Sequence, residues 1–422
     1  MNTAVRPELS AVQAAARAAA QALPLEQLDP SNPELFFNDT VSHTFERLRR
    51  EDPVHRTHSP FFGDYWSVTR YQDIMSVDTR HNLFSSDWRR GGIVIGDIPP
   101  EESMPMFIAM DPPKHDVQRK TVSPIVSPNH LEHLEPIIRE RAGALLDAVP
   151  RGEVFNWVDK ISIELTTQML ATLFDFPWED RRKLTRWSDV ATAAPGQGVV
   201  ESDEQRKMEL MECLQYFNGL WDERAKAPPR NDLISMLAHG PSTKDMPRQE
   251  FLGNLVLLIV GGNDTTRNSI TGSVYALNKF PDQFAKLKAN PALIPSLVSE
   301  TIRWQTPLAF MRRTALEDVE IRGKTIKKGD KVAMWYVSGN RDDEVIADPN
   351  TFNIERENVR RHLSFGFGIH RCVGNRLGEM QLRIVWEEIL KRFEKIEVMD
   401  EPKRVYSSFV KGYESLPVRI AA

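Results

Sequence analysis

One cysteine in this chain lies in a glycine-rich loop directly before a helical pattern. Residues 365–374 read FGFGIHRCVG, and apolar residues then recur at helical spacing from Val373 to Ile384. A sulfur at a helix start meets the positive end of the helix dipole and backbone N–H groups, which favour the thiolate. The glycines permit tight turns and let a flat cofactor approach the backbone. Cys372 is therefore predicted to be a metal ligand or a nucleophile, rather than a structural cysteine beside a turn.

A second candidate site lies in the longest helical pattern, residues 251–280. A run of six apolar residues at 255–260 is followed by GGNDTT at 261–266. A buried carboxylate in an apolar helix is costly without a function or a partner. Asp264 and Thr265 are therefore predicted to move or donate protons, and the alternative is a helix kink without chemistry.

Charged pairs at helical spacing form a third group. His115 and Arg119 follow the turn at 111–113 at positions i and i+4, so they share one helix face that suits a carboxylate ligand. Glu300 and Arg303, at i and i+3, share a face of the predicted helix at 295–304. Isolated pairs of this kind are usually solvated and contribute little.

Composition limits the classes of function. The 422 residues show no repeat or linker, which predicts a single domain over 1–422. The net charge of -5 provides no basic field for nucleic acid. Two cysteines, Cys213 and Cys372, are too few for a disulfide framework and favour a reducing cytoplasm. The longest apolar run is too short for a membrane anchor.

Most of the chain has helical periodicity, which predicts a mainly α fold. Alternating runs at 54–59, 65–69 and 319–336 predict a smaller β-rich lobe from about 54–70 and 307–355, with the remainder helical. A final strand pair is expected around 409–413. The irregular segment 85–109 has the character of a binding loop, and 191–200 of a flexible connection.

Together these motifs resemble the cytochrome P-450 monooxygenases. The spacing Phe-x-x-Gly-x-His-x-Cys-x-Gly matches the family's haem-binding loop, with Cys372 at the position of the axial iron ligand. The resemblance implies the cytochrome P-450 fold, with haem b between the long central helix and the cysteine-loop helix. Arg312 competes with Arg313 for one propionate-binding position. The implied haem-binding residues are His115, Arg119, Arg313, Phe365, His370, Cys372 and Gly374.

The GGNDTT segment resembles the family's oxygen-activation segment. By resemblance, Asp264 relays protons and Thr265 donates a hydrogen bond to bound dioxygen, while the paired glycines permit a local helix bulge. Thiolate ligation favours O–O cleavage, so the implied reaction inserts one oxygen atom into a C–H bond. The tentative substrate residues are Ile93, Leu257, Val260, Gly261, Ala309 and Phe409, and the implied structural ion cluster is Glu300, Arg303 and Arg356.

The sequence lacks a dinucleotide-binding motif, so NAD(P)H electrons are expected to arrive through a ferredoxin and its flavin reductase. A basic docking face is expected at Arg360, Arg361, Arg371 and Arg376, unless these residues form a plain solvated edge.

Residues 261–269 look closest to the bacterial branch that hydroxylates medium-chain alkanes and fatty acids at the terminal carbon. Two alternatives remain open. One is a peroxide-driven fatty-acid peroxygenase, and the other is a haem sensor or electron carrier without enzymatic activity.

Overall fold

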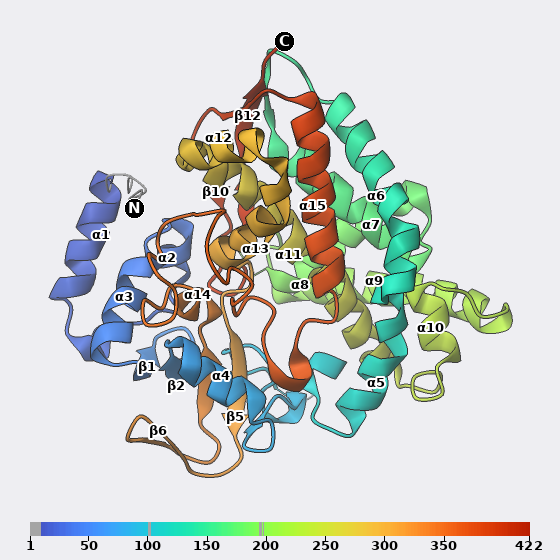
Figure 1. The fold of residues 1–422 in the computed structure, drawn as a ribbon. Helices are drawn as coiled ribbons and strands as arrows, with labels where there is room; N and C mark the ends of the chain where they lie inside the picture. Colours follow the sequence, from blue (N-terminus) through green and yellow to red (C-terminus); the bar gives the residue numbers. More distant parts are fainter. Residues whose placement is uncertain (1–9, 100–102, 194–195, 197) are drawn as a thin grey trace. The chain divides into compact units, whose positions relative to one another are not determined.

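A computed structural model describes residues 10–99, 103–193, 196 and 198–422 of the chain. The described part is mainly helical with small sheets, as the sequence predicts (Figure 1). It separates into two compact units. Unit 1 comprises the described residues of 1–101, 272–372 and 401–416, and unit 2 those of 102–271, 373–400 and 417–422.

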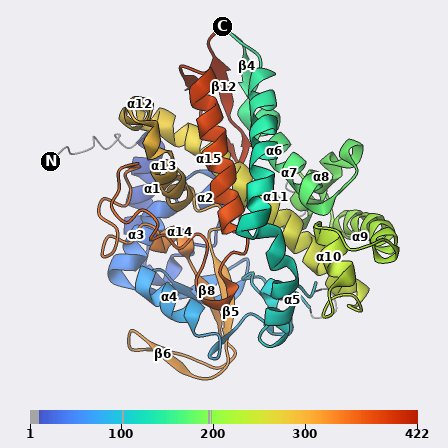
Figure 2. The ribbon, with the colours of Figure 1, turned by 45° about the vertical axis from the view of Figure 1, so that its right-hand side comes forward.

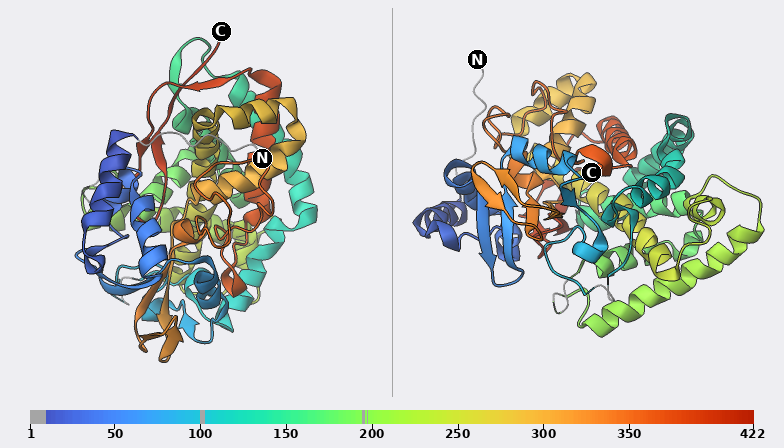
Figure 3. Two further views of the ribbon diagram at one scale, coloured as in Figure 1. Left: turned by 60° about the vertical axis from the view of Figure 1, so that its left-hand side comes forward. Right: turned by 90° about the horizontal axis from the view of Figure 1, so that it is seen from below.

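Unit 1 is built on a five-stranded sheet of order β1-β2-β8-β5-β3. The β1–β2 hairpin is antiparallel, β2 and β8 are parallel, and the remaining pairs are antiparallel. The predicted hairpin and its pairing with later strands are therefore confirmed, and Figure 3 shows the blue early strands beside the orange later ones. The strands are β1 (Val54–Ser59), β2 (Gly63–Val68), β3 (Phe84–Ser85), β5 (Met311–Ala315) and β8 (Lys331–Met334).

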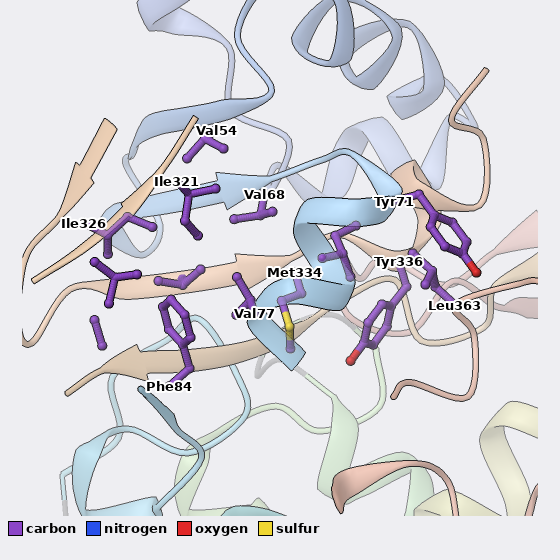
Figure 4. Close-up of a cluster of buried hydrophobic side chains, with 14 residues drawn as sticks. Val54, Val68, Tyr71, Val77, Phe84, Ile321, Ile326, Met334, Tyr336 and Leu363 are labelled. Atoms are coloured by element: carbon purple, nitrogen blue, oxygen red, sulfur yellow. The ribbon is translucent and has the colours of Figure 1, made fainter. Parts of the chain in front are cut away.

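One face of this sheet is covered by α4 (Tyr71–Thr79). Tyr71, Ile74 and Val77 recur at helical spacing, and all three are buried against strand residues such as Val68 and Met334 (Figure 4). This apolar burial fixes α4 on the sheet and sets the direction in which its last turn points.

Two smaller sheets also belong to unit 1. The pair β6 (Val319–Ile321) and β7 (Lys324–Ile326) forms a separate hairpin. The other pair is β10 (Lys403–Arg404) with β11 (Tyr413–Ser415). The strand pair predicted around 409–413 is only partly present: Val410 forms an isolated antiparallel bridge with Leu308, Ala309 N donates to the Phe409 carbonyl at 2.9 Å, and β11 begins at Tyr413.

Unit 1 also contains several α-helices besides α4. The last, α14, follows β8 directly. Helix α13 is followed by Thr306, whose left-handed φ of 44° ends the helix before Pro307. The helices are α1 (Ala11–Ala22), α2 (Pro33–Phe37), α3 (Val41–Glu51), α4, α12 (Pro281–Ala289), α13 (Ile294–Gln305) and α14 (Tyr336–Gly339).

Unit 2 is mostly helical, and α15 packs along α6, as Figures 1 and 2 both show. Ion pairs join these two helices: Arg139 contacts Glu387 and Glu388 at 2.6 and 2.9 Å, and Arg383 contacts Glu135 at 2.9 Å. The helices of the unit are α5 (Lys114–Val122), α6 (Pro128–Asp147), α7 (Glu164–Phe174), α8 (Arg182–Thr192), α9 (Asp203–Lys226), α10 (Leu233–His239) and α15 (Asn375–Arg392). A π-helical segment, Val158–Ile163, leads into α7.

A three-stranded antiparallel sheet in unit 2 lies outside the spans where the sequence predicts the β-rich lobe. Its order is β4-β12-β9, with strands Val154–Asn156, Pro417–Ile420 and Ile396–Val398. These three strands lie far apart in the sequence and are not joined by turns, so local pattern does not indicate which of them pair.

The longest helix is α11 (Arg248–Lys279), which confirms the helix predicted at 251–280. At 1.5 Å per residue its 32 residues span about 48 Å. The helix continues through the paired glycines, without the expected local bulge. A Cβ at Gly262 would lie 2.7 Å from Leu170 Cδ2 of α7, whereas a Cβ at Gly261 would meet nothing within 4 Å. Close packing therefore requires the second glycine and not the first.

Among the described helices, none is long and apolar enough to cross a membrane.

Candidate active site

The cysteine loop of unit 1 has a defined backbone geometry. Gly366 and Gly368 adopt left-handed φ values of 65° and 66°, so the tight turns predicted for these glycines are present. The Cys372 N–H donates to the Phe365 carbonyl at 2.8 Å, and α15 begins at Asn375, directly after Gly374. The loop thus closes on itself and holds Cys372 just ahead of a helix start.

The two cysteines differ in their surroundings. Cys372 is exposed, whereas Cys213 of α9 is fully buried. Burial raises the pKa of the Cys213 thiol well above its ordinary value, so this residue stays a neutral thiol. Cys372 is therefore the cysteine of this chain that can reach a ligand as a thiolate.

Asp78, at the end of α4, contacts the cysteine loop, and sequence reasoning missed it. Its Oδ2 accepts hydrogen bonds from Phe367 N and the Tyr336 hydroxyl at 2.8 and 3.0 Å. Its Oδ1 accepts from Arg313 Nη2 at 2.8 Å. The atoms nearest to a Cβ at Gly368 belong to Asp78 and Thr79, the closest at 2.7 Å. Gly368 is therefore needed because the end of α4 packs against it, rather than because a cofactor approaches the backbone there.

The other candidate residues of the loop region lie as follows. Arg313 is buried and donates to Asp78 and to the carbonyl of Arg312. His370 is buried, and its Nε2 lies 2.7 Å from Ser86 Oγ. The Phe365 ring packs 5.2 Å from the His362 ring.

Arg312 has a different role from its neighbour, because it holds the segment 90–97. Its Nη1 contacts the carbonyls of Val94 and Ile95 at 3.3 Å each and Asp97 Oδ1 at 2.8 Å, and its Nη2 reaches the Arg90 carbonyl at 3.2 Å. Arg312 N also donates to the Ile93 carbonyl at 2.8 Å. Because the Arg312 guanidinium is engaged by this segment, Arg313 is the better candidate for the propionate-binding position.

In unit 2, α11 carries a partly accessible stripe. Leu257, Val260, Gly261 and Thr265 retain accessible surface, whereas the helix around them is largely buried. The Thr265 hydroxyl donates to the Gly261 carbonyl one turn back at 2.9 Å. The stripe thus combines two apolar side chains, a glycine with open space and a hydroxyl.

Asp264, next to that stripe, is fully buried and strongly hydrogen-bonded. Its Oδ1 lies 3.0 Å from Ser188 Oγ, 3.2 Å from Asn263 Nδ2 and 3.1 Å from Arg267 Nη2, and its Oδ2 lies 3.4 Å from Thr192 Oγ1. Burial raises the pKa of Asp264, and the opposing charge of Arg267 only partly offsets it. The carboxyl can therefore hold a proton at higher pH than an exposed aspartate.

A connection leads from Asp264 toward solvent. Arg267 Nη2 also donates to Asp189 Oδ1 at 2.7 Å, and the Asp189 side chain is 31% exposed. Ser188, Asp189 and Thr192 all belong to α8, so one helix supplies several partners of the buried carboxyl. The sequence places these residues far from the GGNDTT segment and offers no motif for them.

His115 and Arg119 occupy α5 of unit 2. His115 is buried, and its Nδ1 lies 2.7 Å from Asp116 Oδ1. Burial lowers the pKa of His115, although Asp116 opposes that shift. Arg119 is half-buried one turn later.

The remaining candidate residues belong to unit 1. Glu300, Arg303 and Arg356 form one ion cluster, in which Glu300 and Arg303 are fully buried. Ala309 has no exposed surface and lies in an apolar cluster, against which Phe409 packs while half-buried.

Comparisons with known proteins give a consistent result. The family model described as cytochrome P450 matches residues 153–414. The chain belongs to the cytochrome P450 family. It is 36% identical to linalool 8-monooxygenase of Pseudomonas putida, over 93% of this chain and 99% of that protein. It is 30% identical to the methyl-branched lipid omega-hydroxylase of Mycobacterium bovis, over 90% of this chain and 91% of that protein.

Among solved structures, cytochrome P450-153 from Novosphingobium aromaticivorans is 47% identical, with a TM-score of 0.87. The match covers 93% of this chain and 99% of that structure. This cytochrome P450 is thus a monooxygenase of the oxidoreductase class. Its family implies haem, dioxygen and external electron donors.

Proposed function

We propose that this cytochrome P450 hydroxylates the terminal carbon of medium-chain alkanes or fatty acids with electrons from a ferredoxin. The observation that carries the proposal is the accessible apolar stripe of α11, which has the buried Asp264 network directly beside it. The stripe offers an aliphatic contact surface, and the adjacent carboxyl offers a proton.

The residues present fit haem b. Cys372 is an accessible sulfur ahead of a helix start, and the pKa shift of Cys213 excludes the other thiol. Gly261 has open space where a side chain would stand, which suits a flat group and dioxygen. Cys372 would bind the iron, with Phe365 and Gly374 beside it, and His115, Arg119, Arg313 and His370 would hold the propionates. When bound, a thiolate-ligated haem activates dioxygen for insertion into a C–H bond.

Asp264 and Thr265 would supply the protons of the reaction. Burial raises the pKa of Asp264, so its carboxyl can take up and give up a proton at higher pH than an exposed aspartate. Thr265 carries a hydroxyl on the accessible stripe, and this hydroxyl would turn from the Gly261 carbonyl to donate a hydrogen bond to dioxygen. Asp189, which reaches solvent and shares Arg267 with Asp264, would exchange protons with solvent, while Arg267 stays charged and holds the two carboxyl groups in place.

The substrate is proposed to be a linear hydrophobic chain. Leu257, Val260 and Gly261 form the aliphatic face of α11, and Ile93 and Phe409 remain candidates in unit 1. Each buried methylene contributes about 0.8 kcal/mol to binding, so affinity should rise with chain length until the space is filled. The omega-hydroxylase among the relatives supports attack at a chain end.

The ferredoxin is proposed to bind the side of the protein that carries the cysteine loop. Arg360, Arg361 and Arg371 are exposed in unit 1, and Arg376 is exposed in unit 2. Exposed arginines attract an acidic partner and accelerate its encounter. A cytoplasmic location fits a chain with only two cysteines, too few for a disulfide framework.

The decisive experiment is turnover of octane and dodecanoic acid by the purified holoenzyme with ferredoxin, reductase and NADH. Terminal alcohol in this system, and little with hydrogen peroxide alone, is the expected result. Turnover by peroxide alone would favour the peroxygenase, and no turnover despite haem reduction would favour a sensor or an electron carrier. A series of chain lengths and head groups, read by the shift of the Soret band, would then define the substrate.

A further inference from the structure

Asp78 is a buried carboxylate whose two oxygens serve different parts of unit 1. Its side chain is 1% exposed, and so it cannot exchange its protein partners for water. One oxygen accepts from Arg313, and the other accepts from the backbone of Phe367 and the hydroxyl of Tyr336. Burial and the Asp78 charge raise the pKa of Tyr336 well above its ordinary value, so its hydroxyl remains a donor.

The contact with Phe367 reaches Cys372 through a short path. Phe367 N–H is held by Asp78, and the carbonyl of Phe365, two residues earlier, accepts the Cys372 N–H at 2.8 Å. Gly368 packs so closely on the Asp78 backbone that a side chain there would stand 2.7 Å from the carbonyl oxygen. The loop backbone is therefore fixed against the end of α4 at two adjacent points.

The contact with Arg313 balances a buried charge. Arg313 and Asp78 are both almost fully buried. Arg313 Nη1 donates a hydrogen bond to the backbone carbonyl of Arg312. Removal of one partner from a buried ion pair leaves the other uncompensated. The direction of the Arg313 guanidinium therefore depends on Asp78.

We propose that Asp78 is a positioning residue that holds the cysteine loop and Arg313 in fixed register with each other. The inference rests on the proposed function, in which Cys372 binds iron and Arg313 binds a propionate. It goes further because it assigns the orientation of both groups to one carboxylate that belongs to none of the motifs in the sequence.

The test compares Asp78→Ala and Asp78→Asn with a matched control, Asp73→Asn. Asp73 lies on the same helix and is also ion-paired, at 2.5 Å from Arg322 Nε, but this pair joins α4 to the turn between β6 and β7 rather than to the cysteine loop. Two properties of the holoenzymes are measured. One is hydrogen exchange at the amides of Phe367 and Cys372, and the other is the rate at which the ferrous carbonyl complex loses the absorption band of thiolate-ligated haem.

We expect Asp78→Ala to exchange these amides about tenfold faster, because a buried donor loses its acceptor. The thiolate band should also disappear about tenfold faster, since the loop no longer holds Cys372 in place. Asp78→Asn keeps one acceptor oxygen and should change exchange less than Asp78→Ala. Asp73→Asn should match the wild type in both measurements.

Wild-type exchange and wild-type band stability in both Asp78 variants would overturn the proposal. Equal changes in Asp73→Asn would also overturn it, because they would show a general loosening of α4. If the wild-type protein itself lacks the thiolate band, the proposed function fails, and the exchange measurement alone then decides whether Asp78 positions the loop.

Discussion

Arg303 donates to both carboxylate oxygens of Glu300, at 2.7 and 2.8 Å, and neither side chain is more than 1% exposed. Asn353 N and Arg356 Nε donate to the same carboxylate. Arg303 also reaches the carbonyls of Asn340 and Pro349. One buried pair thus connects α13 with the segment that leads to the cysteine loop.

Replacement of Glu300 by Gln should destabilise unit 1 by about 3–5 kcal/mol, because it leaves the buried Arg303 and the partly buried Arg356 without their counter-charge. We expect the purified variant to carry less haem, as measured by the ratio of Soret to protein absorbance. Glu355→Gln is the control, since Glu355 pairs with Lys286 at the surface and its side chain is 51% exposed. Normal haem content in Glu300→Gln would contradict this account of the cluster.

The two adjacent glycines of α11 should respond in opposite ways to alanine. Gly262→Ala forces a contact with Leu170 and should cost about 1–3 kcal/mol. Gly261→Ala meets open space and should stabilise the helix by up to about 1 kcal/mol. Chemical denaturation of the two variants measures the difference. Combining Gly262→Ala with Leu170→Ala should be less destabilising than the sum of the two changes.

Arg312→Met should loosen the segment 90–97 of unit 1. The variant loses the hydrogen bonds to the carbonyls of Arg90, Val94 and Ile95 and to the Asp97 carboxylate. Proteolysis within this segment should therefore become faster. Arg312→Lys should restore little, because a single ammonium cannot reproduce the fork of the guanidinium. Unchanged cleavage in both variants would show that other contacts hold the loop.

Thr265→Ala should retain haem but release hydrogen peroxide in place of product. The variant loses the hydroxyl on the accessible stripe of α11 that we propose as the hydrogen-bond donor to dioxygen. The measurement is product formed per NADH consumed. Ser269→Ala is the matched control, because Ser269 makes the same bond to a carbonyl one turn back, at 2.8 Å, but is buried. Full coupling in Thr265→Ala would disprove the assigned role.

Glu388 should make the stability of unit 2 depend on acid pH. Burial alone would raise its pKa, but hydrogen bonds from Lys391, Arg139 and Arg392 prevail and lower it from 4.5 to about 2. A lowered folded-state pKa means that the stabilisation is present above pH 4.5 and is lost as the pH falls toward about 2.

Glu388→Gln should therefore cost up to about 3 kcal/mol at neutral pH, at 1.36 kcal/mol per pKa unit. The difference between variant and wild type should shrink as the pH falls through that interval. Urea unfolding at several pH values provides the measurement, and a difference that is constant with pH would exclude this electrostatic origin.

The sequence predicts those structural elements and motifs that depend on residues close together in the chain. The helix at 251–280 and the hairpin at 54–69 follow from local periodicity, and the cysteine loop follows from its spacing. Asp78 could not be found in this way, because its partner Arg313 lies 235 positions away and many helices carry a carboxylate in the last turn. The same holds for Arg312, whose contacts depend on where the segment 90–97 lies in the fold.

Burial also separates residues that the sequence treats alike. Gly261 and Gly262 cannot be distinguished from the sequence motif, but only Gly262 packs against Leu170. Ala309 and Phe409 were both candidates for substrate contact, yet Ala309 has no exposed surface. Neighbouring helices decide these differences, and a single sequence does not contain their positions.

Because β12 is the central strand of the β4-β12-β9 sheet, this sheet can form only at the end of protein synthesis. Residues 154–156 leave the ribosome long before residues 417–420, which supply their pairing partner. Until translation reaches Pro417, β4 and β9 have unsatisfied backbone edges, which other chains could pair with. A nascent protein that stalls short of this strand is thus expected to need chaperone protection.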